Sequence, residues 1–349
     1  MKSEAPAMLS RHFYFAVVLI WLSGWPSTGA FASTHDFYAG KTVRILVGAS
    51  AGGAFDTWGR MVGRHLGKQI PGNPVVVVEN VTGAGGLILA NQVFKTTRLD
   101  AMTIATFNGG LLMGQMLGRP GIEFDARKFE YLGVPAKFDS VCAFSKASGI
   151  TSFERWKIAK APVKVGGTAP GSNLVDIPKV LMAVFGLPTQ IITGYKGFAE
   201  IRLAVDGGEL GGACGGWDGI KLLWGKQIET GDVAVVMQTR SQPLADLPKV
   251  PLVMDFASND HDRQLIEVGI QFPALLGLTY ALPPGTPKNR VQLLRKAFMD
   301  TVASPDFLVD VQRARLVTDA ATGEELQKTV ERLFSLRPAV ADRLREILK

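Results

Sequence analysis

Five residues near the start of the chain match the pattern of a nucleophilic serine. Gly48-Ala49-Ser50-Ala51-Gly52 reads G-x-S-x-G and follows an apolar run over 43–47, as a nucleophile elbow does. That run is the first strand expected after the N-terminal segment, so no earlier strand supplies an oxyanion loop. The next helix is expected over 57–69 with Asp56 as its N-cap, several residues after Ser50. A serine hydrolase using Ser50, with His65 or His261 as its base, is therefore the less favoured alternative.

Further glycine-rich loops follow other apolar runs, at 80–86, 108–110, 166–173, 193–197 and 215–219. They lack the Lys-Ser/Thr ending of a phosphate loop and the G-x-G-x-x-G spacing. Glycine in each of them could simply permit a tight turn. Their repetition after strands favours ligand contact, because backbone N–H groups at helix N-termini bind anions with help from the helix dipole.

Four side chains beside the later loops have two interpretations each. Trp217 fills the core beside Trp224 or stacks on a ligand ring. Asp218 caps the next helix, which is favoured, or accepts a hydrogen bond from a ligand amine or hydroxyl. Tyr195 and Lys196 contact an anion, or Lys196 is simply solvated.

Alternating strands and helices must position these loops. Strands are predicted over 43–47, 74–79, 102–107, 163–165, 190–192, 210–214, 233–237 and near 276–281. Helices are predicted over 57–69, up to about 97, over 174–185 and 198–205, and twice after the turn at 283–287. Strand–loop–helix repeats predict parallel strands with right-handed crossovers, and ligands bind at the carboxyl ends of such strands. Two such clusters indicate two lobes that face one cleft.

Composition narrows the classes of partner. The chain has 349 residues, 47% of them hydrophobic and 20% charged, which is typical of a globular protein. A net charge of +7 without any run of five Lys or Arg favours a small anionic ligand over nucleic acid. Two cysteines exclude a four-cysteine zinc site, and we expect neither a metal nor a cofactor.

The first 32 residues are predicted to be a signal peptide. Lys2 and Arg11 precede an apolar run over 13–22, and Ala30-Phe31-Ala32 matches the small-x-small cleavage pattern. The run is shorter than the roughly 20 residues that span a membrane, although an uncleaved anchor is the alternative. Cleavage after Ala32 would release a periplasmic protein. That compartment permits a disulfide, but the apolar, strand-like surroundings of Cys142 and Cys214 favour two buried free thiols.

Taken in order, these motifs resemble the tripartite tricarboxylate transporter substrate-binding proteins, the Bug family of extracytoplasmic solute receptors. The resemblance covers the whole expected mature chain. Its elements are 43–47 with Gly52, Gly53 and Asp56; 75–80 with 83–86; Gly194-Tyr195-Lys196-Gly197; and the segment YALPPGTP over 280–287. The first loop, GASAGG, stands where the family usually has prolines, and GGWDG is bulky for a small dicarboxylate.

The resemblance implies an α/β fold of the periplasmic-binding-protein type II class, with two lobes around a ligand cleft and two hinge crossings. Residues 36–138 and 275–349 would form lobe 1, with the C-terminal helices packed on its sheet, and 139–274 would form lobe 2. It also implies a monomeric, non-catalytic receptor that captures a small organic carboxylate and docks transiently on membrane transporter subunits. A sensor that docks on a signalling receptor is the alternative.

By position, the family's carboxylate-binding loops map onto both lobes of this chain. The implied ligand-binding residues of the first lobe are Ser50, Ala51, Gly53, Asp56, Thr82, Gly83, Ala84, Gly85, Gly86 and Asn108. Those of the second lobe are Thr168, Ser172, Tyr195 and Asp218, and Trp217 is added for an aromatic or amine-bearing carboxylate.

Overall fold

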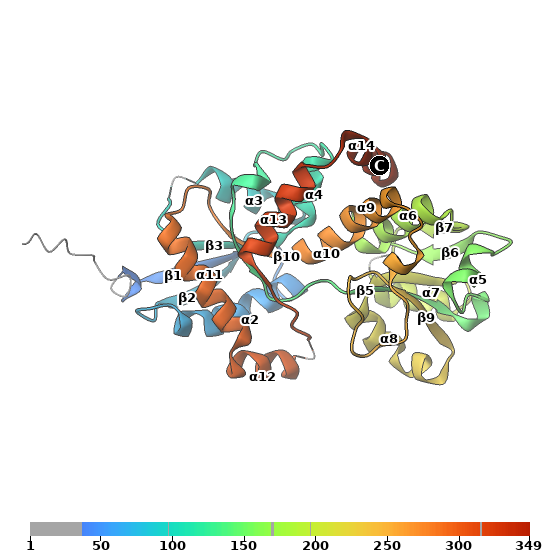
Figure 1. Cartoon of the computed structure of the whole chain (residues 1–349). Coiled ribbons are helices and arrows are strands. Elements are labelled where there is room, and N and C mark those ends of the chain that lie inside the picture. Colours follow the sequence, from blue (N-terminus) through green and yellow to red (C-terminus); the bar gives the residue numbers. More distant parts are fainter. Residues whose placement is uncertain (1–36, 97, 169–170, 196, 315) are drawn as a thin grey trace, which may run out of the picture.

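The computed structural model describes residues 37–349 except 97, 169–170, 196 and 315. The predicted signal peptide and Lys196 lie outside the described residues. Within the described part, two sheets, each covered by helices, form two lobes side by side (Figure 1). None of the described helices has both the length and the apolar character needed to cross a membrane.

The first lobe is built on a six-stranded sheet in the order β11-β4-β10-β3-β1-β2. Its strands are β1 (Thr42–Val47), β2 (Val75–Asn80), β3 (Thr103–Asn108), β4 (Glu130–Val134), β10 (Leu278–Leu282) and β11 (Ala321–Thr322). The predicted parallel pairing is confirmed, because β1 pairs in parallel with both β2 and β3. Strand β10 returns from late in the chain and lies antiparallel between β3 and β4.

Helices cover both faces of this sheet. They are α2 (Ala54–Gln69), α3 (Leu87–Lys95), α4 (Gly110–Met116), α11 (Lys288–Ala303), α12 (Pro305–Arg313) and α13 (Gly323–Phe334). Alternate residues of β1 enter different cores: Ile45 packs with Trp58 and Phe298, whereas Leu46 packs with Leu89 on the other face. This alternation is the two-residue period of a strand buried on both faces.

The second lobe is built on a five-stranded sheet in the order β7-β6-β8-β5-β9. Its strands are β5 (Ser140–Ser145), β6 (Val163–Gly166), β7 (Thr189–Ile192), β8 (Gly212–Gly216) and β9 (Val233–Gln238). Strand β6 pairs in parallel with β7 and β8, and β5 runs antiparallel to β8 and β9. The principal helices are α5 (Phe153–Lys157), α6 (Asn173–Phe185), α7 (Phe198–Asp206), α8 (Trp217–Thr230) and α9 (Asp260–Ile266).

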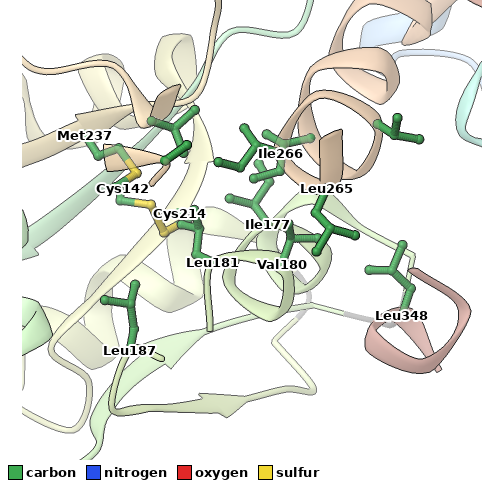
Figure 2. Close-up of a cluster of buried hydrophobic side chains, with 14 of the residues drawn as sticks. Cys142, Ile177, Val180, Leu181, Leu187, Cys214, Met237, Leu265, Ile266 and Leu348 are labelled. Carbon is green, nitrogen blue, oxygen red and sulfur yellow. A yellow bond between two sulfur atoms is a disulfide. The ribbon is translucent and has the colours of Figure 1, made fainter. Parts of the chain in front are cut away.

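A disulfide joins Cys142 to Cys214, so the prediction of two free thiols is wrong. The antiparallel register of β5 and β8 places the two residues directly opposite each other, with their Cα atoms 4.0 Å apart. The bond lies in the core beside Leu181 and Met237 (Figure 2). Because β5 and β8 are far apart in the sequence, the local surroundings of each cysteine could not reveal this register.

The chain passes between the sheets twice before its C-terminal helices. The first crossing is the segment 135–139, between β4 and β5. The second is a helical segment in which a π-helix, η5 (Glu267–Gln271), joins α9 to α10 (Phe272–Leu276). Arg240, just after β9, binds both Asp139 of the first crossing (2.9 Å) and Asp319 of the first lobe (3.0 Å).

The C-terminal helices differ from the prediction in number and place. Among the described residues, four helices follow β10 instead of two, the last being α14 (Pro338–Leu348). Helices α11 and α13 pack on the first sheet as predicted, whereas α12 packs on α2 and α11, and α14 does not pack on this sheet. Its Val340 and Leu344 share a buried cluster with Val180 and Leu265, and the helix lies over α6 and α9 (Figure 1). The lobe boundaries at 138/139 and 274/275 stay a prediction.

Candidate ligand site

The loop after β1 is held from within the protein by Asp56. Helix α2 begins at Ala54 with Gly53 as its N-cap, so the prediction that Asp56 is the N-cap is wrong. The Oδ2 atom of Asp56 accepts hydrogen bonds from the Gly52 N–H (2.8 Å) and from Arg60 Nε (3.0 Å). The bonds from Arg60, Gly52 and Asn80 lower the pKa of this buried carboxyl to about 2. Asp56 therefore positions the loop, and its two oxygens are already engaged.

Asn80 ties that loop to the one after β2. Its Nδ2 donates to Ala49 O and to Asp56 Oδ1, both at 2.9 Å, and its Oδ1 accepts from Arg60 Nη2 at 3.0 Å. The two loops also touch at their glycines, since a Cβ on Gly86 would lie 3.0 Å from Gly48 O. Neither Asn80 nor Arg60 is predicted as a site residue from the sequence, although both organise the site.

The predicted residues of these two loops form one edge of the first lobe. The exposed members are Ser50, Ala51, Gly53, Thr82, Ala84 and Gly85, whereas Gly83 is half-buried and Gly86 is buried. Gly85 adopts φ +64°, and a Cβ there would meet no atom within 4 Å. None of these loop residues has a cationic side chain, so their N–H groups and hydroxyls are what they can offer an anion.

Ser50 does not have the surroundings of a nucleophile elbow. Three residues separate it from the start of α2, whereas an elbow turns directly into its helix. His65 lies about 16 Å along the helix axis from Ala54, the first residue of α2, at a rise of about 1.5 Å per residue. Its Nε2 lies 2.9 Å from Asp310 Oδ2, and its ring packs on Phe307. His261 is in α9 of the second lobe.

A cavity of about 300 Å³ lies between the lobes. The first lobe supplies Asn108, Gly110, Met113 and Arg119, and the second supplies Gly171, Ser172, Asn173, Leu174, Asp176, Ile177 and Gly216. Phe138 of the first crossing, the π-helix with Pro273, and Leu348 of α14 complete the wall. Of the residues predicted as ligand-binding, Asn108 and Ser172 line this cavity. A π-helix within a longer helix is frequent at functional sites.

The cavity contains two charged side chains that are not among the predicted site residues. Arg119 Nη2 lies 3.9 Å from Asp176 Oδ2 across the gap between the lobes. Asp176 Oδ1 also accepts a hydrogen bond from the Gly171 N–H at 3.1 Å. Burial raises the pKa of Asp176, and the bond from Gly171 and the charge of Arg119 oppose that rise. Neither residue stands in a recognisable motif, so only the folded chain brings them to notice.

The remaining second-lobe residues are divided between the site and the core. Thr168 Oγ1 donates to Ser172 Oγ at 2.8 Å, and Ser172 begins α6 as its N-cap. Tyr195 donates its hydroxyl hydrogen to Glu209 at 3.1 Å. These hydrogen bonds constrain the loops that follow β6 and β7, in which Thr168 and Tyr195 lie.

Trp217 and Asp218 follow β8 directly. Trp217 is buried in one cluster with Trp224, and its Nε1 donates to Asp246 at 3.2 Å, which is the core interpretation. Gly216 is the N-cap of α8, so Asp218 does not cap that helix, contrary to the favoured interpretation. Asp218 is exposed, and the protein around it raises its pKa by desolvation.

Comparison with solved structures gives extensive likenesses of low sequence identity. A TctC solute-binding protein from Polaromonas, without ligand, has a TM-score of 0.70 at 18% identity, over 89% of this chain and 98% of that chain. The periplasmic binding protein BugD has a TM-score of 0.60 at 21% identity, over 89% and 98%. This chain has the fold of the TctC and BugD binding proteins.

That finding confirms the predicted fold class, and the resemblance inferred from the motifs holds as a likeness in fold. MatC from Rhodopseudomonas palustris, solved with bound malate, has a TM-score of 0.58 at 16% identity, over 88% of this chain and 99% of that chain. No family model matches the sequence, and no curated protein matches it either.

Proposed function

We propose that this protein is an extracytoplasmic receptor that captures a small organic carboxylate for a transporter of the tripartite tricarboxylate type. The cavity between the lobes is the observation that carries the proposal, because both lobes and both crossings contribute to its wall. Its volume of about 300 Å³ suits a small molecule. Proteins of the same fold include one with bound malate.

The ligand would be contacted by neutral groups of the loops and closed in by a hinge motion. The proposed contacts are Ser50, Ala51, Gly53, Thr82, Gly83, Ala84, Gly85, Gly86, Asn108, Thr168, Ser172, Tyr195 and Asp218, with Asp56 in a positioning role. The segment 135–139 and the π-helix are the natural hinges, since each connects the two lobes.

The remaining parts of the proposal concern processing and partners. The chain would be cleaved after Ala32, act in the periplasm as a monomer, and dock transiently on membrane subunits. It would perform no chemical step and bind no nucleic acid. Closure would mark the loaded state for the membrane partner, because the closed lobes present a different surface from the open ones.

A thermal-shift screen of di-, tri-, aromatic and amino-carboxylates, followed by calorimetry, tests the proposal. A ligand at 100 times its dissociation constant adds about 2.7 kcal/mol to the free energy of unfolding. If no compound of the panel raises the unfolding temperature, the proposal that this protein is a carboxylate receptor is wrong. Ester hydrolysis that is lost in Ser50→Ala would overturn the non-catalytic role.

A further inference from the structure

The wall of the interlobe cavity carries one positive and one negative side chain. Arg119 and Asp176 are its only charged lining residues in the described part of the chain. Arg119 follows α4 of the first lobe, and Asp176 lies in the first turn of α6 in the second. The two charges therefore face each other from different lobes.

The side chains of Arg119 and Asp176 lie near each other but form no hydrogen bond with each other. Their closest nitrogen and oxygen atoms are 3.9 Å apart, which is too long for a hydrogen bond. The guanidinium of Arg119 has no other ionic partner among the described residues, and 41% of its side chain is exposed. One carboxylate oxygen of Asp176 accepts from Gly171 N–H, and the other faces Arg119.

This wall suits a ligand with both signs of charge. A ligand carboxylate placed beside Asp176 would be repelled, because like charges repel strongly in a partly dehydrated space. An ammonium group there would instead compensate the carboxylate, whose pKa is raised by burial. The rest of the wall is neutral, with polar side chains from Asn108, Ser172 and Asn173.

We propose that the ligand is a zwitterionic amino-carboxylate, with Arg119 binding its carboxylate and Asp176 binding its protonated amine. The inference rests on the proposed function and narrows its ligand class. The ligand would replace one loose ion pair by two charge-assisted hydrogen bonds, one to each lobe. Binding would thereby join the lobes, because the two groups that it satisfies belong to different lobes.

Calorimetry on matched pairs of compounds tests the proposal. Each pair has one carbon skeleton with and without an amine: glutamate and glutarate, and 2-aminobutyrate and butyrate. At pH 7 we expect the amine-bearing member of each pair to bind about tenfold tighter or more. Asp176→Asn, which keeps an acceptor for the Gly171 N–H, should reduce the ratio to about threefold or less.

Two further variants separate the roles. Arg119→Gln should weaken both members of each pair by a similar factor of about ten or more, since both carry the carboxylate. Arg155→Gln is the matched control, because Arg155 is an exposed cation of α5 that does not line this cavity. It should leave all four affinities unchanged.

The outcomes distinguish the two proposals. Equal or tighter binding of the amine-free members overturns the zwitterion proposal and leaves the carboxylate receptor standing. An amine preference that Asp176→Asn, shown to be folded by circular dichroism, does not alter also overturns it. If no compound of either series binds and the wider carboxylate screen is silent, the receptor itself is overturned.

Discussion

Reducing the disulfide between Cys142 and Cys214 should destabilise the second lobe without disturbing the first. The bond joins residues 72 positions apart in the sequence. In the chain-entropy account, a cross-link that closes a loop of this size lowers the conformational entropy of the unfolded chain. The free energy of unfolding rises by about 4 kcal/mol at 25 °C as a result. With a denaturant slope of about 2 kcal/mol per molar, the urea midpoint should fall by about 2 M.

The assay is urea unfolding followed by tryptophan fluorescence, with and without reductant. Trp156, Trp217 and Trp224 are buried in the second lobe, so the signal reports chiefly on the lobe that contains the bond. Cys142→Ala/Cys214→Ala is the control, because its midpoint should not respond to reductant. The reasoning is refuted if reduction leaves the midpoint of the natural protein unchanged, or if thiol labelling of the unreduced, unfolded chain modifies both cysteines.

Four other predictions follow from the loops and the first crossing. Asp56→Ala should lower the free energy of unfolding by about 2 kcal/mol, because it removes the acceptor of three partly buried hydrogen bonds. Since the pKa of Asp56 is lowered to about 2, this stabilisation should be complete above about pH 4 and vanish as the pH falls to about 2, which acid titration of both proteins can check. Ser50→Ala should weaken carboxylate binding in calorimetry by about 0.5–1.5 kcal/mol, and a larger loss would show that Ser50 does more than donate one hydrogen bond. Gly85→Leu should abolish binding, because the new side chain would block the ligand's approach to this loop. Circular dichroism should stay native, because a Cβ at Gly85 meets no atom within 4 Å and the positive φ costs only about 1–2 kcal/mol. Retained binding would contradict the proposed role of the loop. Burial raises the pKa of Asp139 to about 6 despite Arg240, so its ionisation should lower stability as the pH rises from about 4 through 6, and Asp139→Asn should flatten that part of the stability profile.

The alternation of strands and glycine-rich loops was predictable because each of these elements depends on residues that are adjacent in the sequence. Runs such as 43–47 and 233–237 combine β-branched residues with a loop that ends them, and both are strands in the structure. The C-terminal helices were undercounted although Ser304-Pro305 marks a helix start, with Ser304 as N-cap and proline in the first turn.

Other features depend on contacts that no local pattern encodes. The apolar spacing of α14 fits either sheet equally well, and only tertiary packing places Leu344 against the second lobe. The same holds for the site. Arg119 and Asp176 belong to different lobes, so their approach depends on how the lobes meet. Asp56 was noticed for its residue type, but its role depends on Asn80 and Arg60, which fold up to it from β2 and the next turn of α2.

A crystal structure of the protein with the tightest-binding carboxylate from the screen tests the central claim most directly. The account predicts that the ligand lies in the interlobe cavity, in contact with Asn108 of the first lobe and Ser172 of the second. A ligand bound on the outer surface of one lobe, with the interlobe cavity left to solvent, would contradict it.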